Sequence, residues 1–285
     1  MIDTTAIAIT LLCIFPATPL PQQSEHSDKN ANEFARAILQ NELNAEANDH
    51  SHWMLMLEAE KSGEKEVDQV IETKDGELKR PLLINGRPLT AKQEQEVDEQ
   101  IRRMIGDAKA LHKSLKQQNE DADRSQRLLK MLPDALIFSF GERRGDAVRL
   151  HFTPNYNFRP ANREARVFQA MEGDLWVDSK QGRLMEISGH LTREVKFGGG
   201  LLGYLNAGGT FEVKQAEVAR GFWELTVLNV NMKGKALFFR TIGVQQRVQR
   251  SDFHRIQDNL TLAEAADLLR KQIIAGSRSA LSSQN

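Results

Sequence analysis

Three short apolar runs separated by turn residues stand out in the first third of the chain. They cover residues 52–58, 66–73 and 77–84. Each is followed by a pair of turn-forming residues, namely Ser62-Gly63, Asp75-Gly76 and Asn85-Gly86. Asp-Gly and Asn-Gly supply the positive φ angles that tight hairpins require. The pattern therefore predicts three successive antiparallel strands.

Apolar residues at three- and four-residue steps predict helices in four places. The first covers residues 31–48. The second starts at Thr90-Ala-Lys-Gln93, which has the form of a capping box, and continues as one long amphipathic helix to Leu115. A further helical piece over residues 123–132 closes before Pro133. The last helix starts at a second capping box, Thr261-Leu-Ala-Glu264, and carries apolar residues up to Ile273.

Between Pro133 and Thr261 the pattern is that of strands. Alternation is clearest where Val148, Leu150 and Phe152 interleave with polar residues. Turns are predicted over residues 178–182 and at Lys233-Gly234. The predicted strands cover residues 135–140, 147–153, 166–177, 182–190, 210–218, 222–232 and 236–246.

These hairpin-linked strands predict one large antiparallel sheet of about ten strands. Three segments are apolar at successive positions, which would put apolar side chains on both faces of the sheet: residues 53–57, 136–140 and 237–239. Something must then cover each face, and the amphipathic helices are suited to do so. We expect a mainly β protein of the α+β class, with a curved antiparallel sheet, or half-barrel, packed with helices.

The first residues are typical of a secretory signal peptide. An apolar run over residues 6–15 is followed by Pro16-Ala17-Thr18-Pro19 and then by polar residues. We expect a signal peptide over residues 1–22 and an exported protein, periplasmic or secreted. The alternative is a buried N-terminal strand. The run is too short to span a membrane.

Composition narrows the classes of function. Lys and Arg number 38 against 39 Asp and Glu, so the chain has no excess positive charge for binding nucleic acid. The single cysteine, Cys13, lies in the predicted leader, which excludes a disulfide framework or a cysteine-based metal cage. We expect no cofactor, no metal and a monomer.

No motif points to catalysis. Residues 198–203 match G-x-G-x-x-G, but residues 204–209 are too short for the crossover helix of a dinucleotide site. His50-Ser-His52 lacks convincing further metal ligands, and we interpret it as a solvated turn. A group of three arginines flanks a loop at residues 154–162 and is interpreted as exposed charge, with an anion site as the alternative: Arg159, Arg163 and Arg166. We predict that the protein is not an enzyme.

Several segments together carry a family resemblance. The leader, the hairpins at residues 72–77 and 83–89, and the segments 168–178 and 232–239 look like those of uncharacterised exported bacterial proteins. Their architecture is similar to that of the outer-membrane lipoprotein carrier and sorting (LolA/LolB-like) superfamily. The resemblance implies one half-barrel domain over residues 31–275, with a helical insertion at 90–132 and a flexible tail at 276–285. It also implies an apolar concavity that takes acyl chains, and no catalytic residue.

We therefore expect a non-enzymatic cell-envelope protein that binds a lipid, a lipoprotein acyl chain or another apolar ligand in the concave face of its sheet. The rival hypothesis is a protein-interaction or sensor module whose concavity is plugged by helices, with an envelope protein as partner. An exported hydrolase is a third possibility. The predicted ligand contacts are Trp53, Leu55, Phe138, Phe140, Trp176, Trp223 and Phe238, with Phe197, Leu201, Leu202 and Tyr204 from the glycine-rich loop.

Overall fold

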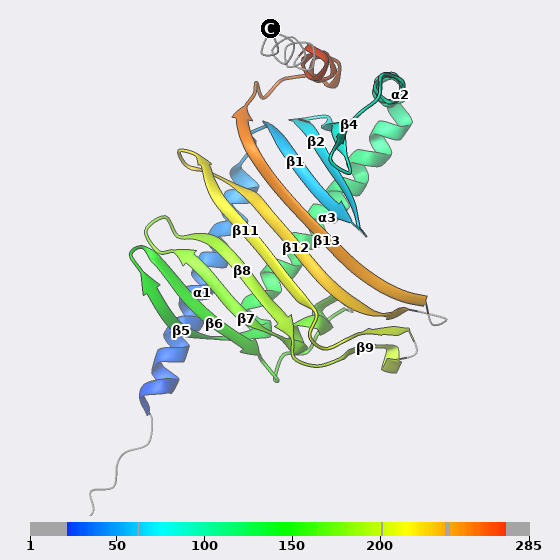
Figure 1. The fold of residues 1–285 in the computed structure, drawn as a ribbon. Coiled ribbons are helices and arrows are strands. Elements are labelled where there is room, and N and C mark those ends of the chain that lie inside the picture. Colours follow the sequence, from blue (N-terminus) through cyan, green and yellow to red (C-terminus); the bar gives the residue numbers. More distant parts are fainter. Residues whose placement is uncertain (1–21, 62, 163, 201, 237–239, 272–285) are drawn as a thin grey trace, which may run out of the picture.

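The fold is dominated by one large antiparallel sheet (Figure 1). The computed structural model describes residues 22–271 except residues 62, 163, 201 and 237–239, so the predicted leader and tail, Leu201 and Phe238 lie outside the described residues. The sheet contains 13 strands in the order β4-β3-β2-β1-β13-β12-β11-β8-β7-β6-β5, with β10 paired to β12 and β9 paired to β10. It is not closed into a barrel. The prediction of a mainly β protein built on a large antiparallel sheet is confirmed.

The strands are β1 (Trp53–Lys61), β2 (Glu64–Thr73), β3 (Gly76–Ile84), β4 (Arg87–Pro88), β5 (Leu136–Arg144), β6 (Ala147–Pro154), β7 (Met171–Asp178), β8 (Arg183–Leu191), β9 (Val195–Phe197), β10 (Gly203–Leu205), β11 (Thr210–Ala219), β12 (Phe222–Ala236) and β13 (Arg240–Arg255). The helices are α1 (Gln22–Asn48), α2 (Ala91–Gly106), α3 (Ala108–Ala135), the 3₁₀ helices η1 (Glu164–Ala170) and η2 (Gly198–Gly200), and a C-terminal helix whose described part covers residues 262–271.

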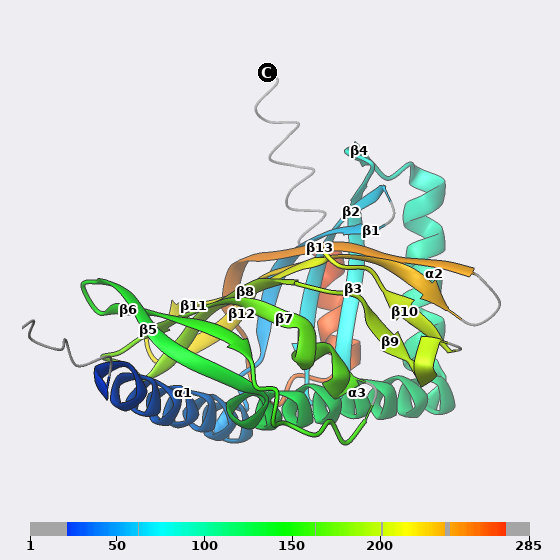
Figure 2. The ribbon, with the colours of Figure 1, turned by 90° about the horizontal axis from the view of Figure 1, so that it is seen from below.

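The sheet has an inner face, turned toward α1 and α3, and an outer face. Figure 1 shows both helices behind the sheet, and Figure 2 shows them beneath it, with α1 toward the β5–β6 end and α3 toward the β3 end. Side chains of α1 and of the end of α3 form the main core cluster with β5, β6, β7 and β8. At the other end of the sheet, the outer face of β1–β3 packs against α2 and the C-terminal helix.

Strand register keeps one row of apolar side chains on the inner face. Successive cross-strand partners along this row are Leu150, Leu175, Ile187, Val213, Leu228 and Val248. Because side chains alternate along a strand, the neighbouring row lies on the outer face. That outer row is polar. Its successive members, each paired with the next across neighbouring strands, are His151, Asp174, Ser188, Glu212, Asn229, Arg247 and Glu60.

Apolar side chains lie on both faces at β1 and at β5, but both faces are covered only at β1 of these two strands. There Met54 packs into the outer cluster with Ile71 and the C-terminal helix, while Trp53 lies in a separate buried cluster. On β5, Ile137 is 40% exposed on the outer face, so its apolar side chain is left partly open there. The third segment, residues 237–239, lies outside the described residues.

The predicted helical region departs from expectation at two points. The capping box at Thr90 is present, but α2 ends at Gly106 and α3 starts anew at Ala108, so the long helix to Leu115 is interrupted. The helical piece predicted over residues 123–132 belongs to α3. It does not close before Pro133, because α3 continues through this proline to Ala135. A proline in the last turn removes one N–H donor only, and Ala135 and Leu136 bury the helix end in the core.

Two strand predictions also needed correction. Residues 166–170 belong to η1, because Ala165, Phe168 and Met171 are buried at the three-residue spacing of a 3₁₀ helix, and β7 starts only at Met171. Lys233-Gly234 is not a turn, since β12 continues to Ala236. A Cβ at Gly234 would lie 2.1 Å from the carbonyl oxygen of Tyr204, so this glycine admits β10 against β12.

Glycine at position 173 sets a sharp test of the central packing. A Cβ there would lie 2.0 Å from the Ser188 carbonyl oxygen and 2.9 Å from the Phe152 ring. We predict that Gly173→Ala lowers the free energy of unfolding by about 2 kcal/mol or more, measured by urea denaturation. Gly106→Ala is the matched control, because no atom lies within 4 Å of its added Cβ. Equal stability of the two variants would contradict this packing.

Candidate functional site

Coverage of the inner face is uneven along its apolar row. Leu150 and Leu175 are fully buried beneath the helices, whereas Val213 and Leu228 are only half-buried. Val230, two residues further along β12, is half-buried as well. We call Val213, Leu228 and Val230 the open strip. It lies on β11 and β12, between the main core cluster and the cluster around Trp53.

The path of α3 explains why the open strip is left uncovered. Leu111 and Leu115, near its start, lie against Gly76 in the β2–β3 hairpin, and Leu132 at its far end belongs to the main core cluster. The middle of the helix therefore passes between the two ends of the sheet (Figure 2). Residues 116–127 contain a single apolar residue, Ala122. A helix segment of this composition has no apolar stripe with which to bury the strip.

A pocket of about 460 Å³ lies beside the open strip, where the end of α1 approaches β2 and β12. We call it the end pocket. Its floor and walls combine charged, aromatic and aliphatic side chains. It is lined by Glu42, Ala45, Glu46, Asp49, Ser51, Glu72, Ser125, Leu129, Arg183, Gln215, Trp223, Glu224 and Leu225.

A buried ion pair fixes one wall of the end pocket. Arg183 on β8 donates from Nε and Nη2 to the two carboxylate oxygens of Glu42 on α1, at 2.8 and 3.2 Å. Glu42, only 6% exposed, also accepts the backbone N–H of Leu184 at 2.6 Å. The Arg183 guanidinium lies 5.4 Å from the ring centroid of Trp223, whose Nε1 donates to Gln181. These contacts tie α1 to the sheet.

Two glutamates on the inner face form the opposite side. Glu72 accepts the backbone N–H of Trp53 at 3.3 Å and lies 3.6 Å from Arg250. Burial raises the pKa of the Glu72 carboxyl to about 7, and the nearby Glu224 adds to this rise against the opposing charge of Arg250. Burial also raises the pKa of Glu224, with Asp49 acting in the same direction. The Glu72 carboxyl thus exchanges its proton near neutral pH.

Of the predicted ligand contacts, Trp223 lies in the end pocket. Trp53, Leu55 and Phe138 are almost wholly buried inside packed clusters, so they fill the core in this structure. Phe140 is 45% exposed beside Phe34 of α1. These residues do not come together in one site, because their positions on the inner face are separated by several strands.

The remaining predicted contacts lie elsewhere. Trp176 is covered by the guanidinium of Arg144, 4.9 Å from its ring centroid. Phe197 packs on the main core cluster, while Tyr204 pairs with Lys235 where β10 joins β12. Leu202 lies against the Cβ position of Gly198. The glycine-rich loop therefore folds back onto the sheet.

Sequence reasoning missed the charged residues of the end pocket. Glu42, Glu72, Arg183 and Glu224 are far apart in the chain and belong to no motif. One signal was present: Val70 and Glu72 alternate on the inner face of β2, so a carboxylate interrupts an apolar series. Of the predicted surface arginines, Arg159 and Arg166 are exposed, and Arg163 lies outside the described residues.

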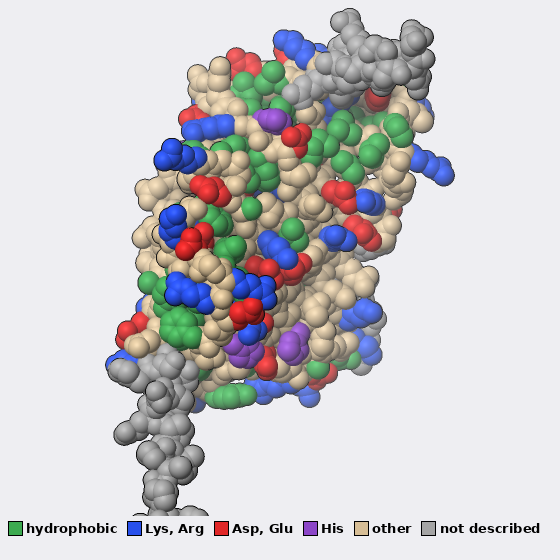
Figure 3. All heavy atoms as spheres, turned by 60° about the vertical axis from the view of Figure 1, so that its left-hand side comes forward, with side chains coloured by type: hydrophobic (Ala, Val, Ile, Leu, Met, Phe, Trp, Pro, Cys, Tyr) green, Lys and Arg blue, Asp and Glu red, His purple; other side chains and the backbone are tan. Residues whose placement is uncertain are grey.

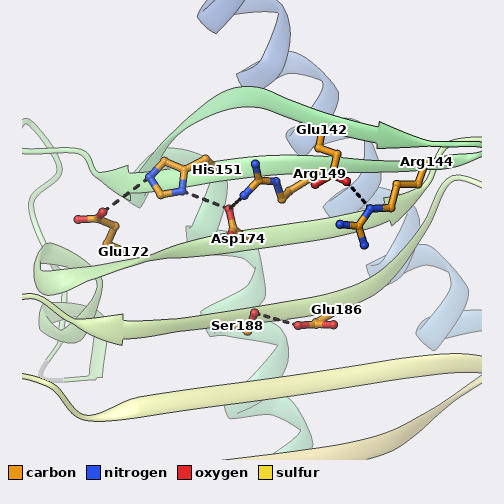
Figure 4. A network of polar contacts seen from close by, with 8 residues as sticks. All are labelled: Glu142, Arg144, Arg149, His151, Glu172, Asp174, Glu186 and Ser188. Atoms are coloured by element: carbon orange, nitrogen blue, oxygen red, sulfur yellow. Dashed lines mark hydrogen bonds and ion pairs between the residues drawn. The ribbon is translucent and has the colours of Figure 1, made fainter.

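The outer face carries a different polar network, drawn in Figure 4. His151 on β6 contacts Asp174 at 3.2 Å and lies 3.8 Å from Glu172, while Arg149 reaches Asp174 at 3.4 Å. Opposite charges on neighbouring strands stabilise a sheet. Figure 3 shows acidic and basic side chains interspersed over the surface turned to the viewer. We interpret this network as ion pairing on the solvent-exposed face of the sheet.

Other kinds of site find no support in the part of the chain that the structure describes. No group of three His, Cys, Asp or Glu side chains there is placed to hold a metal ion. None of its helices combines the length and apolarity needed to cross a membrane. Comparisons with family models, curated proteins and solved structures return no match.

The ion pair in the end pocket gives a stability test. Glu42→Ala leaves the Arg183 guanidinium, 14% exposed, without its carboxylate, and we predict a loss of about 3 kcal/mol in the free energy of unfolding. Asp134→Ala is the control, since its pair with Arg36 is more than half exposed and contributes about 1 kcal/mol at most. Denaturant unfolding of both variants checks the prediction. A smaller loss for Glu42→Ala than for Asp134→Ala would contradict it.

The raised pKa of Glu72 sets a dependence of stability on pH. The folded chain holds this proton more tightly than the unfolded chain, so its contribution is lost as pH rises from about 4.5 to about 7. We predict that Glu72→Gln becomes more stable relative to the unsubstituted protein across this window, by about 1–3 kcal/mol. Thermal unfolding at several pH values measures the difference. Glu96→Gln, on the exposed face of α2, should show none.

Proposed function

We propose that this protein is a non-enzymatic binding protein that holds an amphipathic ligand on the inner face of its sheet. The apolar part of the ligand lies along the open strip, and its polar end lies in the end pocket. The observation that supports the proposal most directly is the unevenly covered apolar row, half-buried at Val213 and Leu228 but fully buried at Leu150 and Leu175. Apolar surface of this kind gains stability when a ligand covers it.

The dimensions suit a ligand of this kind. Glu224, in the end pocket, and Val230, at the far end of the open strip, both lie on β12, six residues apart. At the rise of a strand this separation is about 20 Å. An extended acyl or alkyl chain of ordinary length matches it. Mixed lining, with a few polar groups at one end of an apolar surface, is characteristic of small-molecule sites.

The half-barrel arrangement supports the same interpretation. The sheet bends over α1 and α3, which is the layout that the resemblance to the lipoprotein carrier superfamily implies (Figure 2). Export to the cell envelope, with a lipid or lipoprotein acyl chain as ligand, belongs to the proposal and is supported by the apolar leader. The ligand site differs from our expectation, because the aromatic residues Trp53 and Phe138 are packed away.

The rival function, a protein-interaction or sensor module with a helix-plugged concavity, is favoured by a specific observation. Over β5–β8 the inner face is filled by α1 and α3, and Phe138, Phe152 and Leu150 are at most 1% exposed. If the same were true along the whole face, no ligand would fit. The open strip separates the two functions.

Narrowing the end pocket tests the proposal. We predict that protein purified from a membrane-rich host carries an amphiphile, detected by organic extraction and mass spectrometry. Ala45→Phe combined with Ser125→Phe adds bulk to the pocket walls on α1 and α3, and we expect it to abolish the bound amphiphile. Ala263→Phe, on the exposed side of the C-terminal helix, is the control for a phenylalanine added outside the pocket. A clean extract from the unsubstituted protein, or equal amounts from all three, would favour the rival function.

A further inference from the structure

The lining of the end pocket is unbalanced in charge. Its described residues include five carboxylates and one guanidinium, that of Arg183. This guanidinium is already held by both oxygens of Glu42. The remaining carboxylates, which set the electrostatic potential of the pocket, are Glu46, Asp49, Glu72 and Glu224. Among the neighbours of Glu72, Arg250 offers only a long ion pair of 3.6 Å.

The uncharged lining points independently to an organic ligand. Ala45, Leu129, Trp223 and Leu225 give the pocket aliphatic and aromatic walls, and the open strip continues this surface along β12. The indole of Trp223 already lies under a cation, the Arg183 guanidinium, 5.4 Å from its ring centroid. Aromatic faces attract organic cations in this way. A hydrated metal ion would make no favourable contact with these apolar walls.

We propose that the ligand of the end pocket is an amphipathic organic cation, with an ammonium or guanidinium head beside Glu72 and Glu224 and a hydrocarbon tail on the open strip. This inference rests on the proposed function and adds the charge of the head group to it. An anionic head, such as a fatty-acid carboxylate, would meet like charges in a site of low dielectric constant.

The protonation of Glu72 and Glu224 would respond to a bound cation. Burial favours their protonated form, and a positive charge placed beside them favours the ionised form. Binding of a cation is therefore coupled to the release of a proton near neutral pH. An uncharged ligand brings no charge that favours the ionised form, and an anionic ligand would favour proton uptake instead. Proton release is consequently a measurement that distinguishes the head groups.

Three probes with the same tail test the inference: octylamine, 1-octanol and sodium octanoate. Isothermal titration calorimetry of the full chain at pH 7, in two buffers of different ionisation enthalpy, gives both the affinity and the number of protons released. We expect octylammonium to bind about tenfold to a hundredfold more tightly than octanol, and octanoate to bind more weakly than octanol. Only octylammonium should release protons.

Matched variants assign the effect to the pocket. Glu224→Gln and Glu72→Gln each remove one carboxylate, and we expect each to reduce the preference for octylammonium over octanol at least several-fold. Glu96→Gln, an exposed carboxylate on α2, should leave the preference unchanged. Circular dichroism checks folding, and if one pocket variant fails to fold the other decides.

The possible results separate the two proposals. Equal affinity for the three probes, or tightest binding of octanoate, overturns the cationic head group and leaves the amphipathic binding function standing. A preference for octylammonium that survives Glu224→Gln overturns the location in the end pocket. Failure of all three probes to bind overturns the proposed function itself, and the head-group inference with it.

Discussion

The pairing register of the central strands is the constraint on which the rest of the molecule depends. It aligns Leu150, Leu175 and Leu228 on the inner face and places charged residues such as Asp174 and Glu212 in the next row, on the outer face. A slip of one residue in any strand would put its charges against α1 and α3. Gly173 and Gly189 help to hold the register, because they pair with each other and leave no room for a Cβ.

Because the sheet is much wider than its helices can cover, the inner face is divided into a filled half and an open part. α1 and the end of α3 bury β5–β8, and their contact with the sheet is fixed by the pairing of Glu42 with Arg183. The polar middle of α3 faces the remainder. A polar helix opposite an apolar strip leaves that strip without a partner from the described chain. This division connects the composition of residues 116–127 to a binding function.

Local signals in the sequence predicted the elements well. The Asp75-Gly76 and Asn85-Gly86 turns, the alternation in β6 and the two capping boxes at Thr90 and Thr261 are all present. Predictions that depend on long-range contacts were less accurate. The sequence predicts a turn at Gly234. The glycine is needed there for another reason, because β10 pairs so closely with β12 that a Cβ would collide with the Tyr204 carbonyl oxygen. The charged residues of the end pocket were missed for the same reason, since only the fold brings β2, β8, β12 and α1 together.

Half-buried carboxylates beside the apolar open strip require an explanation beyond folding. Glu72 and Glu224 would cost less stability as glutamines or apolar residues, since burial disfavours their ionised form. The outer face shows how this chain normally treats charge, with acidic and basic side chains paired across strands. The end pocket departs from that practice beside the open strip, where apolar surface is also only half-buried. Both departures have a single physical explanation if a molecule with a positive end and a hydrocarbon end completes the site.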